Sequence, residues 1–181
     1  MKVENFMMPA LRILDPNEGK LKYYYDGDVK NMTVADIKKF VGDFKAGNIE
    51  PWFASEEAPD TQTTEGLTVI VGKTWSDIVN DPEKDVLVKY YAPWCGNCKA
   101  LEPIWKEIAK DAESIEDLVI AEFDHTTNEV KGLMLDGYPT LKFYPKYDKS
   151  GQMFYRGERK FFDIQMWLYE NSDAYRVGKD K

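Results

Sequence analysis

Apolar and polar residues alternate in short blocks along most of the chain, and these blocks predict strands and helices. Ahead of residue 60 they predict two short strands, 10–14 and 21–25, with turn residues at 15–19 between them. A helix is expected to begin at the capping-box residue Thr33 and to end at Gly47. The front of the chain therefore holds few elements.

From residue 67 onward, strands and helices alternate, which is typical of an α/β layer fold. The stretch 86–91 is almost wholly apolar or aromatic, as expected for a central strand that is covered on both faces. Ahead of this region, the polar segment 50–62 contains two prolines and predicts a linker. The predicted strands are 68–71, 85–92, 118–123, 140–144 and 153–156, and the predicted helices are 75–79, 95–111, 127–135 and 161–169.

Composition narrows the class of protein. The chain has 181 residues, 43% hydrophobic and 31% charged, which is typical of a folded globular protein. Its net charge of -8 disfavours binding to the phosphates of nucleic acid, and no apolar run is long enough to span a bilayer. Two cysteines and one histidine exclude a disulfide-rich scaffold and leave a metal site short of ligands. We expect neither a metal nor another cofactor.

The sequence Cys95-Gly96-Asn97-Cys98 stands where the strand 85–92 ends and the helix 95–111 begins. Free N–H groups at a helix N-terminus favour a thiolate, which would make Cys95 reactive. Cys98 lies one turn further along, so both sulfurs face the same side, and Gly96 lets the backbone turn tightly. Such a dithiol can attack a disulfide through Cys95 and resolve the mixed disulfide through Cys98.

Three other uses of the cysteine pair are less favoured. A structural disulfide that closes so small a loop would add little stability. Zinc needs about four ligands, and only His125 and carboxylates remain beyond the pair. Covalent haem needs a histidine directly after the second cysteine, where this chain has Lys99. We expect His125 to be a polar residue at the end of a strand.

The segment 91–99, Tyr-Ala-Pro-Trp-Cys-Gly-Asn-Cys-Lys, resembles the active-site segment of the protein disulfide isomerase family in the thioredoxin superfamily. Further similar segments follow in family order at 71–73, 128–130, 137–140 and 155–159. The front of the chain also resembles the end of the non-catalytic, substrate-binding domain that precedes the last catalytic domain.

This resemblance implies a thioredoxin fold, a central mixed sheet flanked by helices, preceded by a partial thioredoxin-like segment. The implied boundaries are residues 1–62 for the partial domain with its linker, 63–174 for the catalytic domain and 175–181 for a tail. Two strands and one helix are too few to bury a core alone, so the front segment reads as part of a domain whose remainder is missing.

The resemblance also implies roles for matching residues. Cys95 and Cys98 would form the redox-active disulfide, as nucleophile and resolving thiol. Pro139 would be a cis-proline that faces this disulfide, and Tyr138 would offer its backbone to an extended substrate. Arg159 matches an arginine thought to swing toward the resolving cysteine and lower its pKa; the less favoured alternative is a solvated surface residue.

Trp94 and Asn97 are expected to affect the same site. Trp94 either covers the reactive sulfur or serves as an exposed anchor for substrates, and both can hold. The family usually has histidine at the position of Asn97. Because asparagine carries no charge, we expect a less acidic Cys95 and a more reducing couple than in a relative with histidine.

Lys89 is a second departure, because the family commonly has a buried glutamate six residues before the first cysteine, where it accepts a proton from the second. Either the lysine influences Cys98, or its side chain reaches the surface and has no catalytic part. We favour the surface reading.

These observations predict a thiol–disulfide oxidoreductase and isomerase that acts on unfolded or disulfide-containing client proteins, with glutathione or an oxidase as its redox partner and without nucleic acid or membrane. The alternative is a chaperone-type binding module in which the redox site matters little. The resemblance implies the endoplasmic reticulum lumen, although residues 1–14 do not form a secretory signal and 178–181 do not form a retention signal.

Overall fold

The computed structural model describes residues 10–16 and 21–180. The chain divides into two compact units, of which the first extends to Phe53 and the second begins at Ala54. The expected turn at 15–19 lies largely outside the described residues, as does most of the 1–14 segment considered as a signal. Within the described ranges, no helix is long and apolar enough to cross a bilayer.

The first unit contains the two strands and the helix that the sequence predicts. Its elements are β1 (Arg12–Asp15), β2 (Leu21–Tyr24), the short 3-10 helix η2 (Val29–Asn31) and α1 (Val34–Lys45). The strands pair antiparallel. Thr33 caps α1 with the expected capping box, which its hydroxyl forms with Asp36. The ring of Trp52 stacks on Tyr24, with centroids 4.6 Å apart.

This first unit buries little apolar surface. Among its described residues, only the hydrophobic side chains of Tyr23 and Phe40 are buried. On the apolar face of α1, Val34 is 69% exposed, and Ile37 and Val41 are also open to solvent. The prediction that these elements cannot enclose a core by themselves agrees with this exposure.

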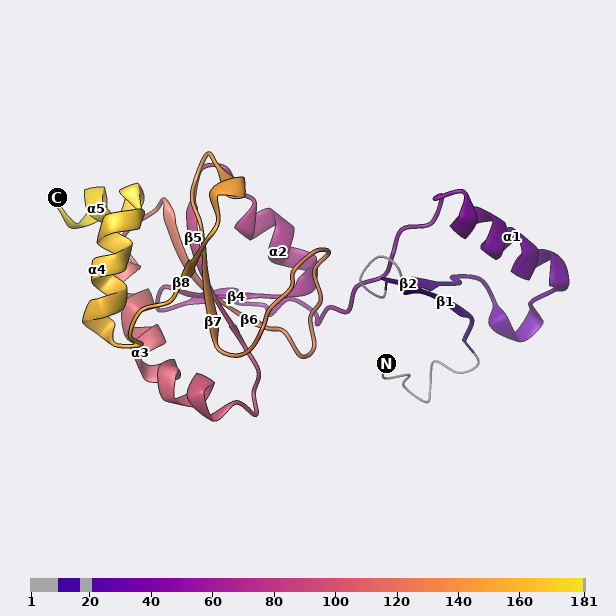
Figure 1. The fold of residues 1–181 in the computed structure, drawn as a ribbon, viewed down its shortest axis with the longest axis horizontal. Coiled ribbons are helices and arrows are strands. Elements are labelled where there is room, and N and C mark those ends of the chain that lie inside the picture. The colour runs from indigo at the N-terminus through magenta and orange to yellow at the C-terminus, as the bar shows by residue number, and fades with distance from the viewer. Residues whose placement is uncertain (1–9, 17–20, 181) are drawn as a thin grey trace. The chain divides into compact units, whose positions relative to one another are not determined.

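The second unit is built on a six-stranded mixed sheet in the order β3-β4-β6-β5-β7-β8 (Figure 1). The strands are β3 (Thr63–Thr64), β4 (Leu67–Ile70), β5 (Asp85–Tyr91), β6 (Leu118–Asp124), β7 (Thr140–Tyr144) and β8 (Met153–Tyr155). The helices are α2 (Gly72–Val79), α3 (Gly96–Ala112), the 3-10 turn η3 (Lys149–Gly151), α4 (Phe161–Asn171) and α5 (Asp173–Lys179). β5 pairs parallel with β6 and antiparallel with β7, so the α/β prediction and the mixed sheet are confirmed.

Two apolar layers fix β5 at the centre of the sheet. On one face, α3 and α4 supply Trp105, Ile164 and Leu168, all with no exposed surface. On the other face, α2 packs through Val79 against side chains that include Tyr90 of β5. Because alternate residues of a strand point to opposite faces, a strand between two such layers must be apolar throughout, as the sequence predicts.

The predicted helix at 127–135 is wrong, because this segment is an irregular loop. Asn128 is 1% exposed, and its side chain is used in bonds outside the segment. Its Oδ1 accepts from the backbone N–H groups of Glu56 and Gly72, both at 2.9 Å. Gly132 then takes a left-handed conformation with φ of 74°, which does not continue a helix. These bonds attach Glu56, which lies in the segment 50–62 that we expected to be a linker, to the rest of the second unit.

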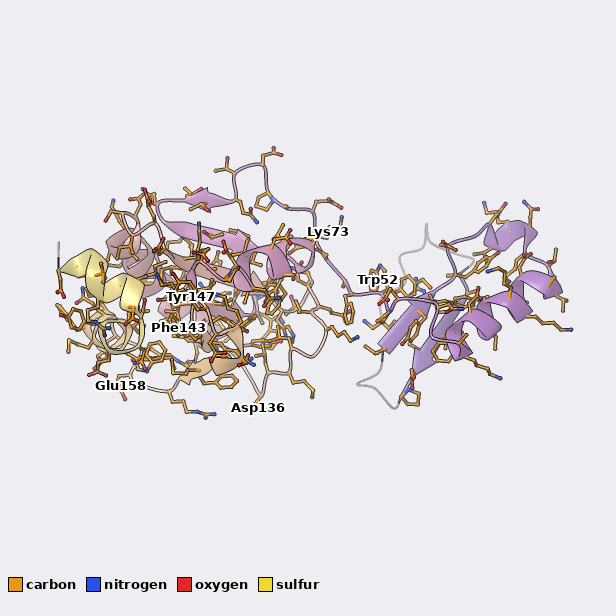
Figure 2. The ribbon with its side chains drawn as sticks, turned by 90° about the horizontal axis from the view of Figure 1, so that it is seen from above. Trp52, Lys73, Asp136, Phe143, Tyr147 and Glu158 are labelled. Atoms are coloured by element: carbon orange, nitrogen blue, oxygen red, sulfur yellow. The ribbon has the colours of Figure 1, made fainter. Side chains whose placement is uncertain are left out.

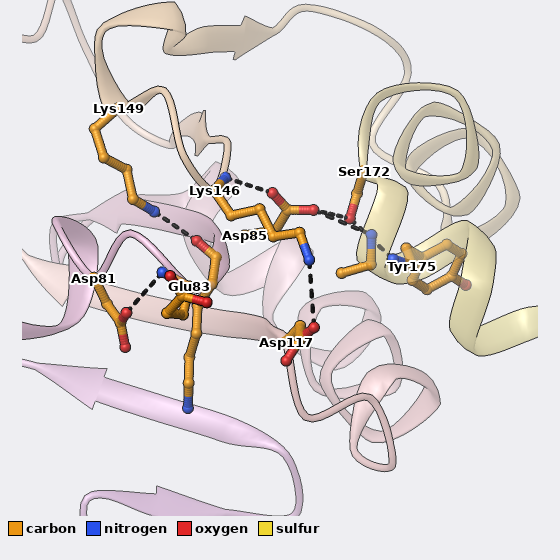
Figure 3. Close-up of polar contacts among 10 residues, drawn as sticks. Asp81, Glu83, Asp85, Asp117, Lys146, Lys149, Ser172 and Tyr175 are labelled. Carbon is orange, nitrogen blue, oxygen red and sulfur yellow. Dashed lines mark hydrogen bonds and ion pairs between the residues drawn. The ribbon is translucent and has the colours of Figure 1, made fainter.

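Besides the short 3-10 segments η2 and η3, the sequence did not predict the strand β3 or the helix α5. A buried carboxylate holds the start of α5 in place (Figure 3). Asp85 is 2% exposed and accepts from the backbone N–H of Lys146 at 2.7 Å and from the hydroxyl of Ser172 at 2.6 Å. It also accepts from the N–H of Ala174 at 3.4 Å. Tyr175, 1% exposed, completes the core on this side.

Candidate active site

The two cysteines lie where β5 gives way to α3, as the sequence predicts. Cys95 is the N-cap of α3, and its Sγ accepts from the backbone N–H of Cys98 at 3.2 Å. Both are free thiols, and they are 9% and 4% exposed. A sulfur that accepts from the first turn of a helix is stabilised in its charged form. The helix then continues through Pro103.

The two sulfurs have opposite acidities. The pKa of Cys95 is lowered from its usual value, chiefly because the thiol of Cys98 donates to its sulfur, with smaller help from backbone N–H groups and the charge of Arg159. Burial raises the pKa of Cys98, and the bond to Cys95 raises it further. The pair therefore has one sulfur prepared to act as thiolate and one kept as thiol.

A loop carrying a cis-proline closes over Cys95. The bond between Tyr138 and Pro139 is cis, as the resemblance implies. The Sγ of Cys95 donates to the backbone oxygen of Tyr138 at 3.6 Å. Arg159 donates from Nη2 to the backbone oxygen of Pro139 at 3.1 Å, so this arginine contacts the loop. Trp94 is 72% exposed, and its ring meets that of Tyr138 edge to face at 6.1 Å.

His125 also reaches this loop. The sequence places it at the end of a strand, remote from Cys95, and it does follow β6 directly. Its Nδ1 shares a hydrogen bond of 2.6 Å with the hydroxyl of Tyr138. Burial lowers the pKa of His125, which keeps the ring neutral near pH 7. The fold thus brings the chain's single histidine to the residue whose carbonyl faces Cys95.

Lys89 is buried, so the expectation that its side chain reaches the surface is wrong. Its exposed fraction is 3%, and its Nζ lies 2.7 Å from Oε2 of Glu122, which is 18% exposed. The register of β5 and β6 places the two residues side by side. The ammonium also lies over the rings of Tyr91 and Trp105, at 5.1 and 5.9 Å.

The charge of Lys89 acts on Cys98, because it is among the causes that lower the pKa of Cys98 against the effect of burial. Glu122, the partner of Lys89, was missed by sequence reasoning. The signal available was a lone acid inside the apolar run 118–123, opposite a lone base inside 86–91. The burial of Lys89 and the burial of Glu122 are both explained by the ion pair that they form.

The structure thus brings the sequence-predicted residues into one region. Gly96 and Asn97 form the first turn of α3, between the cysteines. Among the side chains that the structure describes, no group of three histidines, cysteines or acids is arranged to hold a metal ion. The arrangement of the two sulfurs can do nucleophilic sulfur chemistry.

Comparison with known proteins agrees with this geometry. The family model described as Thioredoxin matches residues 66–170, more than half of the chain. A protein disulfide-isomerase from Gallus gallus is 37% identical over 160 residues, which make up 88% of this chain and 31% of that protein. One from Saccharomyces cerevisiae is 43% identical over 144 residues, 79% of this chain and 27% of that protein. The chain therefore spans under a third of the length of these relatives.

Solved structures include a similar chain, the first thioredoxin domain of mouse Protein disulfide-isomerase A4. It is 27% identical in sequence and superposes with a TM-score of 0.49. The match covers 64% of this chain and 84% of that one.

Proposed function

The chain belongs to the thioredoxin family, as a relative of the protein disulfide isomerases, and we propose that it is a thiol–disulfide oxidoreductase and isomerase that acts on disulfides in proteins. The observation that supports this most is the opposite shift of the two thiols. The pKa of Cys95 is lowered while that of Cys98 is raised, which suits one sulfur to attack and the other to wait.

In the proposed reaction, the thiolate of Cys95 attacks one sulfur of a client disulfide. The client S–S bond breaks, a mixed disulfide with Cys95 forms, and the other client sulfur leaves as a thiolate that takes up a proton. Cys98 then loses its proton and attacks the sulfur of Cys95. The mixed disulfide breaks, and the second client thiol is released. The client disulfide has then been reduced by two electrons, and Cys95 and Cys98 have been oxidised to a disulfide.

The surrounding residues have distinct parts in this scheme. The carbonyl of Tyr138 accepts from the Cys95 thiol while the site is idle, and it would offer the same oxygen to the backbone of an extended client. Pro139 and Trp94 would border the bound client. Arg159 lowers the pKa of Cys95 through its charge. Lys89 favours the thiolate of Cys98 at the moment when that sulfur must attack.

Isomerisation would use the same groups. If a free client thiol attacks the mixed disulfide before Cys98 does, the client disulfide is moved and Cys95 is regenerated as thiolate, without net electron transfer. A redox partner, glutathione or an oxidase, would set the resting state of the pair. By its relation to the protein disulfide isomerases, we place this activity in the endoplasmic reticulum lumen.

The test compares three proteins: the wild type, Cys95→Ala and Cys98→Ala. The assays are reduction of insulin disulfides and refolding of a protein with scrambled disulfides. Cys95→Ala should lose both activities. Cys98→Ala should accumulate mixed disulfides with the client, visible on a non-reducing gel, because the neighbouring thiol that would resolve them is missing. Full activity of Cys95→Ala would contradict the proposal.

A second candidate is a chaperone-type binding module, which the exposed aliphatic side chains of α1 favour. Val34 is 69% exposed, and Ile37 and Val41 lie on the same helix face, open to solvent. Such a face could hold an unfolded client by apolar contact. Suppression of client aggregation by Cys95→Ala, equal to that of the wild type, would support this second role.

A further inference from the structure

A cavity of about 230 Å³ opens beside the cis-proline loop. Met134, Pro139 and Phe154 are among the apolar residues that line it, and Asp136, Arg156 and Arg159 supply its charges. Its volume is below the 300–1,000 Å³ that is typical of sites for whole ligands. The cavity therefore suits one side chain of a larger molecule. The lining comes in part from two loops, and Figure 2 labels one residue of each, Asp136 and Glu158.

Positive charge dominates this lining, although the chain as a whole has a net charge of -8. Among the described residues, neither Arg156 nor Arg159 takes part in an ion pair. Arg159 instead donates to the backbone carbonyl of Pro139. Glu158, between them in sequence, lies instead 3.8 Å from the ammonium of Lys160. Two arginines thus line the cavity, against the single acidic residue Asp136.

The guanidinium of Arg156 is well placed to bind. Its Cζ lies 5.5 Å from the ring centre of Phe154, on the edge strand β8, so the ring supports the group from one side. A guanidinium held in this way presents its remaining N–H donors as a planar fork, which matches the geometry of a carboxylate.

The cavity is also close to the reacting sulfur. Pro139 lines it, and the neighbouring carbonyl of Tyr138 accepts from the Sγ of Cys95 at 3.6 Å. The charge of Arg159 is felt at Cys95. Because successive Cα atoms are about 3.8 Å apart, a residue one or two positions from a client cysteine can reach the cavity while that cysteine meets Cys95.

We propose that this cavity is a subsite for an acidic client side chain, and that Arg156 makes the site prefer disulfides flanked by glutamate or aspartate. The inference rests on the proposed oxidoreductase function and adds a substrate class to it. Arg156 acts on substrate choice, whereas Arg159 also acts on the Cys95 thiol. Asp136 opposes the preference, because it places a like charge beside the bound carboxylate.

The test uses disulfide-linked peptides that differ only in the residue beside the cysteine, which is glutamate, glutamine or lysine. The reduced 181-residue chain is mixed with each peptide at low salt, and kcat/KM for peptide reduction is measured with dithiothreitol as the regenerating reductant. We expect the glutamate peptide to exceed the glutamine peptide by about two- to fivefold, the range of a single exposed ion pair, and the advantage to shrink in high salt.

Three variants locate the effect. Arg156→Gln should bring the ratio of glutamate to glutamine rates close to one, and Asp136→Asn should increase it. Lys160→Gln is the matched control, because Lys160 is an exposed cation of the same loop that does not line the cavity. It should keep the wild-type ratio.

Two results would overturn this inference and leave the proposed function standing. One is that the wild type reduces the glutamine peptide as fast as the glutamate peptide, and the other is that Arg156→Gln keeps the wild-type preference for glutamate. Loss of the preference in Lys160→Gln would also overturn it, since the effect would then belong to the general charge of the loop. Failure of the wild type to reduce any of the peptides would contradict the proposed function, and this inference with it.

Discussion

Replacing Lys89 with methionine should destabilise the second unit, because it leaves the carboxylate of Glu122 without its partner. The two groups are 2.7 Å apart, and their side chains are 3% and 18% exposed. Breaking a buried ion pair by removal of one partner costs about 3–5 kcal/mol, because the remaining charge stays out of water. Glu122 keeps some contact with solvent, so we expect the lower end, about 3 kcal/mol.

The pair itself should contribute little net stability. The desolvation of two charges offsets their attraction, so a matched apolar pair is often neutral or stabilising. The double variant Lys89→Met/Glu122→Leu should therefore lie within about 1 kcal/mol of the wild type. The single Glu122→Leu variant should be destabilised much as Lys89→Met is, since it leaves the ammonium buried.

Urea unfolding of the full chain measures these differences by tryptophan fluorescence. Trp52 is the one tryptophan of the first unit, so a Trp52→Phe background makes the remaining four report on the second unit. With single losses of about 3 kcal/mol each and a double variant within about 1 kcal/mol of the wild type, the double-mutant cycle should give a coupling energy of about 5 kcal/mol. A loss below 1 kcal/mol in Lys89→Met, or additive losses in the double variant, would refute the reasoning.

The same substitution should raise the pKa of Cys98, because the lysine charge favours its thiolate. The rate of Cys98 alkylation against pH, measured in a Cys95→Ser background, should shift to higher pH in Lys89→Met. Lys142→Met is the matched control: Lys142 is also buried, but it contacts Tyr144 and Phe154 and is not among the charges that act on Cys98. An unshifted profile in Lys89→Met would show that Lys89 is structural only.

Three further experiments test other parts of the site and the fold. Because the pKa of Cys95 is lowered and that of Cys98 is raised, the Cys95 thiolate forms first as the pH rises; iodoacetamide at pH 7 should modify Cys95 alone, and equal labelling in peptide mass maps would contradict the assignment. Asn97→His should lower the pKa of Cys95 further and raise the reduction potential by about 30 mV, a tenfold change in the equilibrium with glutathione, whereas an unchanged potential would contradict the argument. Asp85→Ala leaves three donors without their buried acceptor and should cost about 3 kcal/mol in urea unfolding, and a loss below 1 kcal/mol would contradict its role at α5.

The cysteine site could be predicted because its chemistry is local. An apolar strand, a tight turn and a helix N-terminus follow one another within 85–111, so the order of residues already places Cys95 at the cap. The cavity beside Pro139 has no such local signal. Its charges come from two loops, near 136 and 156–159, that meet only in the folded unit.

Lys89 and the 127–135 loop show why the remainder was not predicted. When no partner is known for a lysine in an apolar strand, the sequence predicts that its side chain extends to water. Here the partner, Glu122, is 33 positions away and becomes adjacent only through the parallel register of β5 and β6. In the loop, apolar spacing suggests a helix, but the tertiary bonds of Asn128 outweigh local propensity.

The charges around the two sulfurs also change what the four-residue motif implies about redox behaviour. Asn97 carries no charge, so the motif alone predicts a more reducing couple than one with histidine. However, the cations of Arg159 and Lys89 favour the thiolates of Cys95 and Cys98, respectively. A charge that stabilises a thiolate stabilises the reduced pair and leaves the neutral disulfide unaffected, which makes the couple more oxidising. Because Cys98 stays a thiol, only the cation that acts on Cys95 has this effect, so we expect the potential to depend on Arg159 as well as on the residue between the cysteines.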